Sequence, residues 1–321
     1  MAPNKQLAPL IIFAYNRPLH LKKTLDALQL DPLSDYTVVY FFCDGPKSAT
    51  DAKAVSEVRK IIENQRVFPK SIVSFAEANK GLANSVIYGV SEVLKKHGEA
   101  IILEDDIIVS AGFLSFMNIM LDKFEARKDI YSVTGYNYPL DYTGVEIEPI
   151  YLSYRSSSWG WGTWLDRWES TDWELTTFND FKKDNIRLSR FARGGEDLFQ
   201  MLEMQTRGLL DSWSIRFDFA HFENNATCAH PSISLVDNIG FDGSGTHGVF
   251  TNEYSARIPL DAWIPLPINP NLQISASMLG PFDQKFRPAN YSQNSHNLGL
   301  QNKTSSIPKL FRRLGRKLRV Y

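Results

Sequence analysis

Between residues 9 and 104, short apolar runs alternate with helical segments, and this rhythm constrains the fold more than any other feature of the chain. The apolar runs have the length of buried strands and lie at residues 9–15, 36–43, 71–75 and 100–103. Helices are predicted between them, at residues 19–30, 51–64 and 82–96. Strands that alternate with helices form a mainly parallel sheet covered on both faces. The predicted fold class is therefore α/β, with ligands bound in the crevice beyond the carboxyl ends of the strands.

This rhythm ends after about residue 108. A helix is predicted over residues 112–124, followed by short strands, a Trp-rich loop, a helix near residues 196–207 and a Gly-rich segment. Such a change of pattern predicts a second half with a different role from the first.

Composition indicates a globular protein and excludes several classes of partner. Of 321 residues, 43% are hydrophobic, which is enough for a large core. The formal net charge of -1 provides no overall field that would attract nucleic acid. The two cysteines, Cys43 and Cys228, lie far apart in sequence, which argues against a disulfide framework or a zinc site. The same cysteine usage indicates a reducing compartment, so a cytoplasmic location is predicted. No apolar run reaches the roughly 18 residues that span a bilayer, so any membrane contact would be peripheral.

A basic segment ends the chain. Residues 309–321 contain six basic side chains and no acid, and their apolar side chains fall on one face of a helical wheel. This pattern predicts an amphipathic helix that rests on anionic lipid, so that the protein would be peripheral on the inner face of the membrane. A disordered basic tail is the alternative interpretation. Residues 271–308 are predicted to be a linker, because much of that segment is rich in Asn, Ser and Gln.

Three successive acids, Glu104, Asp105 and Asp106, follow the apolar run at residues 100–103. Repulsion among three carboxylates favours a bound cation, and carboxylate oxygens suit Mg²⁺ or Mn²⁺ when substrate phosphates and water complete the coordination. A solvated acidic turn would explain an isolated Glu-Asp-Asp equally well. The place of the three acids at a strand end, where the crevice is expected, favours the metal site.

Around this cluster the sequence resembles the inverting glycosyltransferases with the nucleotide-sugar fold called GT-A, and among them the relatives of N-acetylglucosaminyltransferase I. Residues 101–111 (IILEDDIIVSA) are similar to the family's strand, Glu-Asp-Asp signature and exit. Residues 136–137 (YN) and 159–164 (WGWGTW) are similar to its aromatic-Asn element and its Gly-rich aromatic loop. The likeness covers about residues 9–250. Further matches follow in the family's order at Asp211-Ser212-Trp213, Arg216, residues 231–234 (PSIS), Gly240 and His247.

The resemblance implies a metal-dependent glycosyltransferase with Mn²⁺ or Mg²⁺ as cofactor. It would transfer a hexose or N-acetylhexosamine, with inversion, from a nucleotide diphosphate donor, expected to be a UDP-sugar. The acceptor would be a hydroxyl of a glycan or a lipid-linked saccharide, as in polysaccharide biosynthesis. Residues 1–108 would form the nucleotide-sugar-binding half and residues 109–270 the acceptor-binding and catalytic half.

The resemblance also assigns roles around the donor. Asp106 matches the direct metal ligand, while Glu104 and Asp105 match positions that contact the nucleotide and the donor sugar. Arg17 and Asp44 match positions that contact the nucleotide base and ribose.

Two further residues are predicted to contact the donor because of their own surroundings. His247 lies in a Gly-rich segment whose backbone could approach a diphosphate, so this His would touch the metal or a phosphate oxygen. Lys80 could neutralise phosphate charge. Simple exposure to solvent is the alternative for both side chains.

Transfer with inversion needs a general base for the acceptor hydroxyl. Asp211 matches the family's base and sits in the sequence Leu-Leu-Asp-Ser-Trp, which predicts an apolar setting. Asp197, at a predicted helix start after two glycines, is the second candidate, although capping and the helix dipole also favour an acid there.

The acceptor side is predicted from an amide and two aromatic rings. Asn137 matches the family's aromatic-Asn element before the acceptor site. Trp159 and Trp161 could form a platform for a sugar ring, because aromatic faces stack on the apolar faces of pyranoses. Core packing is the competing interpretation for some of the tryptophans in this region.

Two other functions stay open from the sequence. Carboxylates at strand ends and Mg²⁺ also serve nucleotidyltransferases and phosphohydrolases. A non-catalytic carbohydrate-binding protein would use the tryptophans, but it leaves the three acids unexplained.

Overall fold

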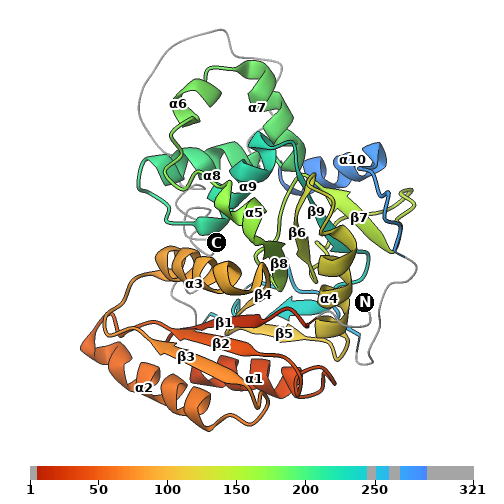
Figure 1. The fold of residues 1–321 in the computed structure, drawn as a ribbon. Coiled ribbons are helices and arrows are strands. Elements are labelled where there is room, and N and C mark those ends of the chain that lie inside the picture. The colour runs from red at the N-terminus through yellow and green to blue at the C-terminus, as the bar shows by residue number, and fades with distance from the viewer. Residues whose placement is uncertain (1–5, 244–250, 260–267, 288–321) are drawn as a thin grey trace.

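The computed structural model describes residues 6–243, 251–259 and 268–287. Within these ranges, eight strands form one sheet in the order β3-β2-β1-β4-β8-β6-β9-β7, and β5 pairs with β10 in a separate antiparallel ribbon. Figure 1 shows the sheet running through the middle of the molecule. Four of its neighbouring strand pairs are parallel and three are antiparallel. The predicted α/β class with a mainly parallel sheet is confirmed.

The parallel part of the sheet consists of the four strands that the alternating pattern predicts. They are β1 (Leu10–Ala14), β2 (Val39–Cys43), β3 (Ser71–Phe75) and β4 (Glu99–Glu104). β1 is fully buried between β2 and β4, whereas β3 is mostly exposed at the edge of the sheet. Because Phe13 of β1 is in register with Phe42 of β2 and with Glu104 of β4, the carboxyl ends of the three strands meet at one edge.

Three helices cover the two faces of this part (Figure 1). Side chains alternate between the faces of a strand, so Ile12 packs in one apolar cluster with Leu21 and Val58, while Phe13 packs in another with Val86. The first cluster includes side chains of α1 and α2, and the second includes those of α3. The bounds of the helices are α1 (Pro18–Leu28), α2 (Ala49–Asn64) and α3 (Leu82–His97).

The remaining strands extend the sheet beyond β4. β8 runs antiparallel to both β4 and β6, β9 is parallel to β6, and β7 forms the other edge. The long helix α4 (Phe113–Phe124), predicted over residues 112–124, packs against β6 and β8. The strand bounds are β6 (Ile130–Thr134), β7 (Ile150–Ser153), β8 (Trp161–Trp164) and β9 (Thr227–Pro231).

A group of helices with its own apolar cluster lies beside this part of the sheet (Figure 1). Its core contains Phe181, Phe191, Leu198 and Phe219. The helix predicted near residues 196–207 is α8 of this group. The bounds are α6 (Phe178–Phe181), α7 (Asn185–Phe191), α8 (Asp197–Thr206) and α9 (Trp213–Glu223), with a 3-10 turn at Ala192–Gly194. Helix α5 (Leu165–Glu169) packs instead against α3 and β8, and its Trp168 belongs to the cluster that contains Phe13.

The predicted linker, residues 271–308, differs from the structure over its first part. Helix α10 (Ala276–Lys285) lies there, and Phe282 and Phe286 pack edge-on against the ring of Tyr138 at centroid distances of 5.7 and 5.4 Å. Composition alone did not predict this helix because Gly280 and Pro281, which disfavour a helix interior, lie inside it.

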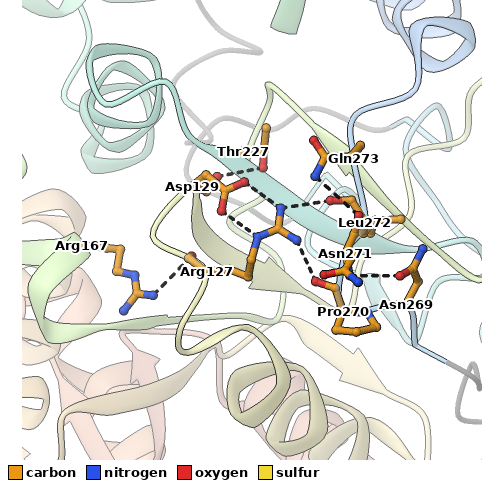
Figure 2. Close-up of polar contacts among 9 residues, drawn as sticks. All are labelled: Arg127, Asp129, Arg167, Thr227, Asn269, Pro270, Asn271, Leu272 and Gln273. Atoms are coloured by element: carbon orange, nitrogen blue, oxygen red, sulfur yellow. Dashed lines mark hydrogen bonds and ion pairs between the residues drawn. The ribbon is translucent and has the colours of Figure 1, made fainter.

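Arg127 fastens the chain just before α10 to the body of the protein, as Figure 2 shows. Its guanidinium forms a two-point ion pair with Asp129 and donates to the carbonyl oxygens of Pro270 and Leu272 at 2.8 and 3.0 Å. The rest of the predicted linker and the basic tail, residues 288–321, lie outside the described residues. Among the residues that are described, no helix is both long and apolar enough to cross a membrane.

Candidate active site

A pocket of about 470 Å³ opens at the carboxyl ends of β1, β2 and β4. The strand register brings these ends together, as the sequence pattern predicts. The side opposite the strands is formed by the loop between α8 and α9 and by residues after β10 (Val236–Asn238). Most of the residues singled out from the sequence line this one pocket, namely Arg17, Asp44, Lys80, the three acids at 104–106 and Asp211.

The three acids sit where β4 turns into β5 (Ile107–Val109). Asp105 is buried, its Oδ2 accepts the N–H of Tyr15 at 3.1 Å, and its carbonyl oxygen accepts the hydroxyl of Thr24 at 2.8 Å. Asp105 therefore holds the β1–α1 connection, which also carries Arg17. Two bonds to β1 and α1 make Asp105 part of the scaffold of the site as well as of its lining.

Asp106 has two carboxylate oxygens in different situations. Nη1 of Arg17 donates to Oδ2 at 2.5 Å, whereas Oδ1 is buried and has no hydrogen-bond partner among the described residues. Pairing of β5 with β10 brings Gly240 against this carboxylate, because Ile239 N–H donates to the Asp106 carbonyl at 2.9 Å. A Cβ added at Gly240 would lie 2.0 Å from Oδ2, so a side chain at position 240 would collide with the acid.

The pKa of each of these three carboxyls is raised. Burial is the main cause for Glu104, whose pKa lies well above its ordinary value, and the charges of Asp106 and Asp105 add to the effect. Burial and the charge of Asp106 raise the pKa of Asp105 to about 7. Burial also raises the pKa of Asp106, and the nearby charges of Arg17 and His20 offset only part of that rise. The protein around the cluster therefore leaves negative charge incompletely balanced, which favours a cation.

The cluster fits a divalent cation that is shared with a ligand. Within the described part of the chain, no three His, Cys, Asp or Glu side chains converge closely enough to enclose a metal ion. Mg²⁺ and Mn²⁺ need no such cage, since they are bound through one or two carboxylates plus phosphate and water oxygens. The buried and unpartnered Oδ1 of Asp106 is an oxygen of the required kind.

Asp44 uses both carboxylate oxygens to organise the wall of the pocket beyond β2. Its oxygens accept the N–H groups of Gly45, Lys80 and Gly81 at distances between 2.8 and 3.1 Å. These bonds tie the start of α3 to the end of β2, so Asp44 positions the backbone on which Lys80 is carried.

An aromatic wall, defined here as Phe13, Phe42 and Tyr88, lines the pocket beside Asp44 and was missed by the sequence analysis. Phe13 stacks on Phe42 at 5.5 Å between ring centroids, and Tyr88 meets Phe42 edge-on at 6.3 Å. The ammonium group of Lys80 lies 4.9 Å from the centre of the Tyr88 ring. Tyr88 is 51% exposed, so a flat ligand has access to this wall.

Asp211 lines the pocket from the loop between α8 and α9, next to Ser212, which caps α9 by accepting the N–H of Ile215. A Cβ added at Gly81 would lie 3.8 Å from Asp211 Oδ2, so this carboxylate approaches the start of α3. The apolar setting expected for Asp211 is not found. Its side chain is 63% exposed, and Arg216 contacts it only at 3.5 Å. Both leucines before Asp211 line the pocket, but Leu210 is buried in the apolar cluster of the helices and does not enclose the acid.

Asp197, the second candidate for the general base, is engaged elsewhere. Arg155 donates to both of its carboxylate oxygens, at 2.8 and 3.0 Å, and Asp197 is absent from the lining of the pocket. The ion pair with the buried Arg155 explains an acid in the first turn of α8 without a catalytic role.

The residues predicted to contact the acceptor are packed in the protein. Trp161 is 1% exposed and stacks on Trp213 at 4.7 Å, and Trp159 is 3% exposed with its ring against Tyr136 at 4.5 Å. The amide of Asn137 donates to the Ser232 carbonyl and accepts two tyrosine hydroxyls. None of these three side chains lines the pocket. Core packing, the competing interpretation, describes the two tryptophans in this structure, and His247 lies outside the described residues.

Comparisons with known proteins found a distant structural likeness. No protein-family model matches the chain, and no curated protein has a significantly similar sequence. The mannosyltransferase PcManGT from Pyrobaculum calidifontis, solved with GDP-Man and Mn²⁺, is 13% identical, with a TM-score of 0.41 over 68% of this chain and 74% of that one.

Two further structures are similar at the same low level. TarS residues 1–349 from S. aureus are 13% identical, with a TM-score of 0.40 over 71% of this chain and 59% of that one. The glycosyltransferase GlyE of Streptococcus pneumoniae TIGR4 is 11% identical, with a TM-score of 0.35 over 69% of this chain and 45% of that one. At this level the likeness concerns the fold, and it is the geometry of the pocket that indicates a function.

Proposed function

We propose that the chain is a metal-dependent inverting glycosyltransferase of the GT-A type. Its donor would be a nucleotide diphosphate sugar, with UDP and a hexose or N-acetylhexosamine suggested by the sequence resemblance. The acceptor would be a hydroxyl of a glycan or a lipid-linked saccharide, as in polysaccharide biosynthesis. The observation that carries the proposal is that one pocket combines three features. They are an aromatic wall, a carboxylate cluster whose negative charge is not fully balanced by nearby cations, and an accessible aspartate.

The donor would lie along the edge formed by β2, β1 and β4. Its nucleotide base would stack on the exposed ring of Tyr88, which meets Phe42 edge-on, next to the backbone organised by Asp44. Its diphosphate would lie toward the acids at 104–106, where Mn²⁺ or Mg²⁺ would be held through Asp106. The bound ion would neutralise the diphosphate as it leaves the sugar.

Asp211 would serve as the general base. Its exposed carboxylate would accept the proton of the acceptor hydroxyl while the hydroxyl oxygen bonds to the anomeric carbon and the bond from that carbon to the diphosphate breaks. Exposure on the pocket side supports this assignment, because the base has to meet an acceptor that enters from solvent. The pairing of Asp197 with Arg155 makes Asp197 the weaker candidate.

The division of labour between residues 1–108 and 109–270 is part of the proposal. Residues 1–108 supply most of the lining of the donor pocket, and Asp211 comes from the second half. The tail at 309–321, whose proposed partner is anionic lipid, lies outside the described residues and stays a prediction from the sequence.

Binding and product analysis test the function together. Isothermal titration calorimetry with UDP-, GDP- and ADP-sugars, with and without Mn²⁺, should identify a donor whose binding depends on metal. Asp106→Ala should abolish that dependence, whereas Asp211→Asn should bind donor normally and fail to transfer. Loss of donor binding in Asp211→Asn together with normal binding in Asp106→Ala would overturn the assigned roles.

The products separate the proposal from its alternatives. Release of nucleoside diphosphate identifies glycosyl transfer, while release of a sugar phosphate would identify phosphoryl chemistry at the same carboxylates. A non-catalytic carbohydrate-binding protein would bind saccharide without metal and release no product.

A further inference from the structure

The resemblance predicts that Arg17 contacts the nucleotide base, but in the structure its guanidinium is bonded to Asp106. Arg17 stands directly before α1, and its guanidinium bonds to Asp106 Oδ2 at 2.5 Å and to the carbonyl oxygen of Gly240 at 3.4 Å. A Cβ added at Gly240 would lie 2.6 Å from Nη1 of Arg17. Arg17 and Asp106 therefore form a close pair against the backbone of Gly240, and a side chain at position 240 would force this pair to move.

This guanidinium is the closest positive charge that the described residues provide to the acids at 104–106. The ammonium group of Lys80 lies over the Tyr88 ring, and Nε2 of His20 lies 3.2 Å from a carboxylate oxygen of Asp242. His20 contributes to the field at Asp106, but burial still raises the pKa of that acid. A cation built into the chain thus partly neutralises the cluster that is proposed to bind a divalent metal.

The two carboxylate oxygens of Asp106 differ in what they contact. Arg17 holds Oδ2, and Oδ1 stays buried without a partner among the described residues. A divalent ion that bound through Oδ1 would share one carboxylate with a guanidinium, and the two like charges would repel each other across it. A diphosphate relieves that repulsion, because its oxygens add negative charge and guanidinium groups bond well to phosphate.

We infer that Arg17 makes divalent-metal binding conditional on the diphosphate. It acts as a resident counter-cation that keeps the affinity of the protein for free metal low and couples metal binding to nucleotide binding. This inference rests on the proposed function, because it assumes that the cluster binds metal and a diphosphate together. Since coupling free energies are reciprocal, the metal raises nucleotide affinity by the same factor by which the nucleotide raises metal affinity.

Mn²⁺ alone tests the inference, with electron paramagnetic resonance used to count free Mn²⁺ and no catalytic readout. We expect Arg17→Met to bind Mn²⁺ roughly tenfold more tightly than the wild type, because one nearby positive charge is removed. Arg17→Lys, which keeps the charge and loses the planar fork, should lie between the two. Lys22→Met is the matched control, since it removes an exposed charge from α1 that bonds only to Asp26, and its Mn²⁺ affinity should equal that of the wild type.

A second titration measures the coupling. Adding UDP, and GDP in parallel, should raise the Mn²⁺ affinity of the wild type by about 5- to 150-fold, in the range of typical coupling energies. The same nucleotides should raise that of Arg17→Met much less. The double variant Arg17→Met with Asp106→Asn should lose the gained Mn²⁺ affinity, which locates the gain at this carboxylate.

Equal or weaker Mn²⁺ binding by Arg17→Met would overturn the inference, and so would equal coupling in both proteins. If the wild type nevertheless shows metal-dependent transfer, only the role of Arg17 falls. If neither protein binds Mn²⁺ under any condition and no transfer is detected, the inference and the proposed function fall together. Circular dichroism of each variant checks that a change in affinity is not a loss of fold.

Discussion

Two clusters of buried charge in this protein differ in how completely their charges are paired within the protein. The 104–106 cluster, which is Glu104, Asp105 and Asp106, has Arg17 as its close cationic partner and lines a pocket. The Arg155 cluster, which is Arg155, Asp197 and Asp218, lies beyond the end of β7 and outside that pocket. The first cluster carries more negative charge than its one close cation balances, whereas Arg155 pairs with Asp197 on both carboxylate oxygens in the second.

The Arg155 cluster is satisfied on every side that the structure describes. Arg155 is 4% exposed, bonds to both oxygens of Asp197, and carries the ring of Phe286 at 3.8 Å from its guanidinium carbon. Asp218 accepts the N–H of Ser156 at 2.7 Å. Burial alone would lower the pKa of Arg155, but the surrounding acidic groups, with Asp197 first among them, together outweigh burial and raise the pKa well above its ordinary value.

The difference teaches which buried charges are available for chemistry. A carboxylate that lines a pocket and keeps an unpartnered oxygen gains from a ligand cation, whereas a bidentate pair covered by an aromatic ring has nothing left to bind. On this argument the first cluster serves function and the second serves stability. Substitutions in the two clusters should therefore change different measurements.

The two candidate bases give the largest expected effect. Asp211→Asn should lower the rate of transfer by about 10²- to 10⁴-fold, because the acceptor hydroxyl loses its proton acceptor. Asp197→Asn should keep the rate per folded molecule and lose thermal stability. Steady-state kinetics with active-site titration measure both variants, and a large loss of kcat in folded Asp197→Asn would reverse the assignment.

Breaking the Arg155 pair gives the next largest effect. Arg155→Met should lower the free energy of unfolding by about 3–5 kcal/mol, because the carboxylates of Asp197 and Asp218 stay buried without their cation. Arg17→Met, which removes an arginine from the other cluster, should cost much less stability. Urea denaturation of the two variants compares them directly, and equal losses would show that the two clusters are not different in kind.

Removing a charge from the 104–106 cluster should increase the free energy of unfolding, whereas breaking the Arg155 pair should decrease it. Asp106→Asn should raise the free energy of unfolding of the metal-free protein, since the acid is held with its pKa raised above the ordinary value. The same denaturation experiment in the presence of a chelator measures it. A clear loss of stability would mean that the bond with Arg17 outweighs burial and repulsion.

The fold and the donor side of the pocket could be predicted because they depend on local pattern. Apolar runs and helical spacing identified β1 to β4, and parallel strands bring their carboxyl ends to one edge, so Asp44 and the three acids had to meet. What the pattern could not supply was the partner of each charge. Arg17 pairs with an acid 89 residues away, and only the pairing of β5 with β10 brings Gly240 to them.

The acceptor side could not be predicted, because burial of an aromatic ring depends on contacts made across the chain. Trp161 is covered by Trp213, which belongs to a helix 52 residues later. Tyr88, whose exposed ring does line the pocket, belongs to α3. The helical pattern predicted α3 as a helix that covers the sheet, but it did not predict that this ring faces a ligand site. One local signal was present: Gly89 follows Tyr88, and a Cβ there would lie 2.8 Å from the Phe13 ring.

The smallest expected effect is a dependence of stability on pH. In the metal-free folded protein the pKa of Asp105 is raised to about 7, from 3.8 in the unfolded chain. Between these values the folded state binds the proton more tightly, so stability should fall as the pH rises from about 4 to 7 and level off above that range. Asp105→Asn keeps an oxygen for the Tyr15 N–H and removes the titration, so its stability should fall less over the same interval. Denaturation at pH 5, 6 and 7.5 in the presence of a chelator measures how the free energy of unfolding of each protein changes with pH. The same change in both proteins would mean that Asp105 is solvated and that the 104–106 cluster is not a cluster of buried charge.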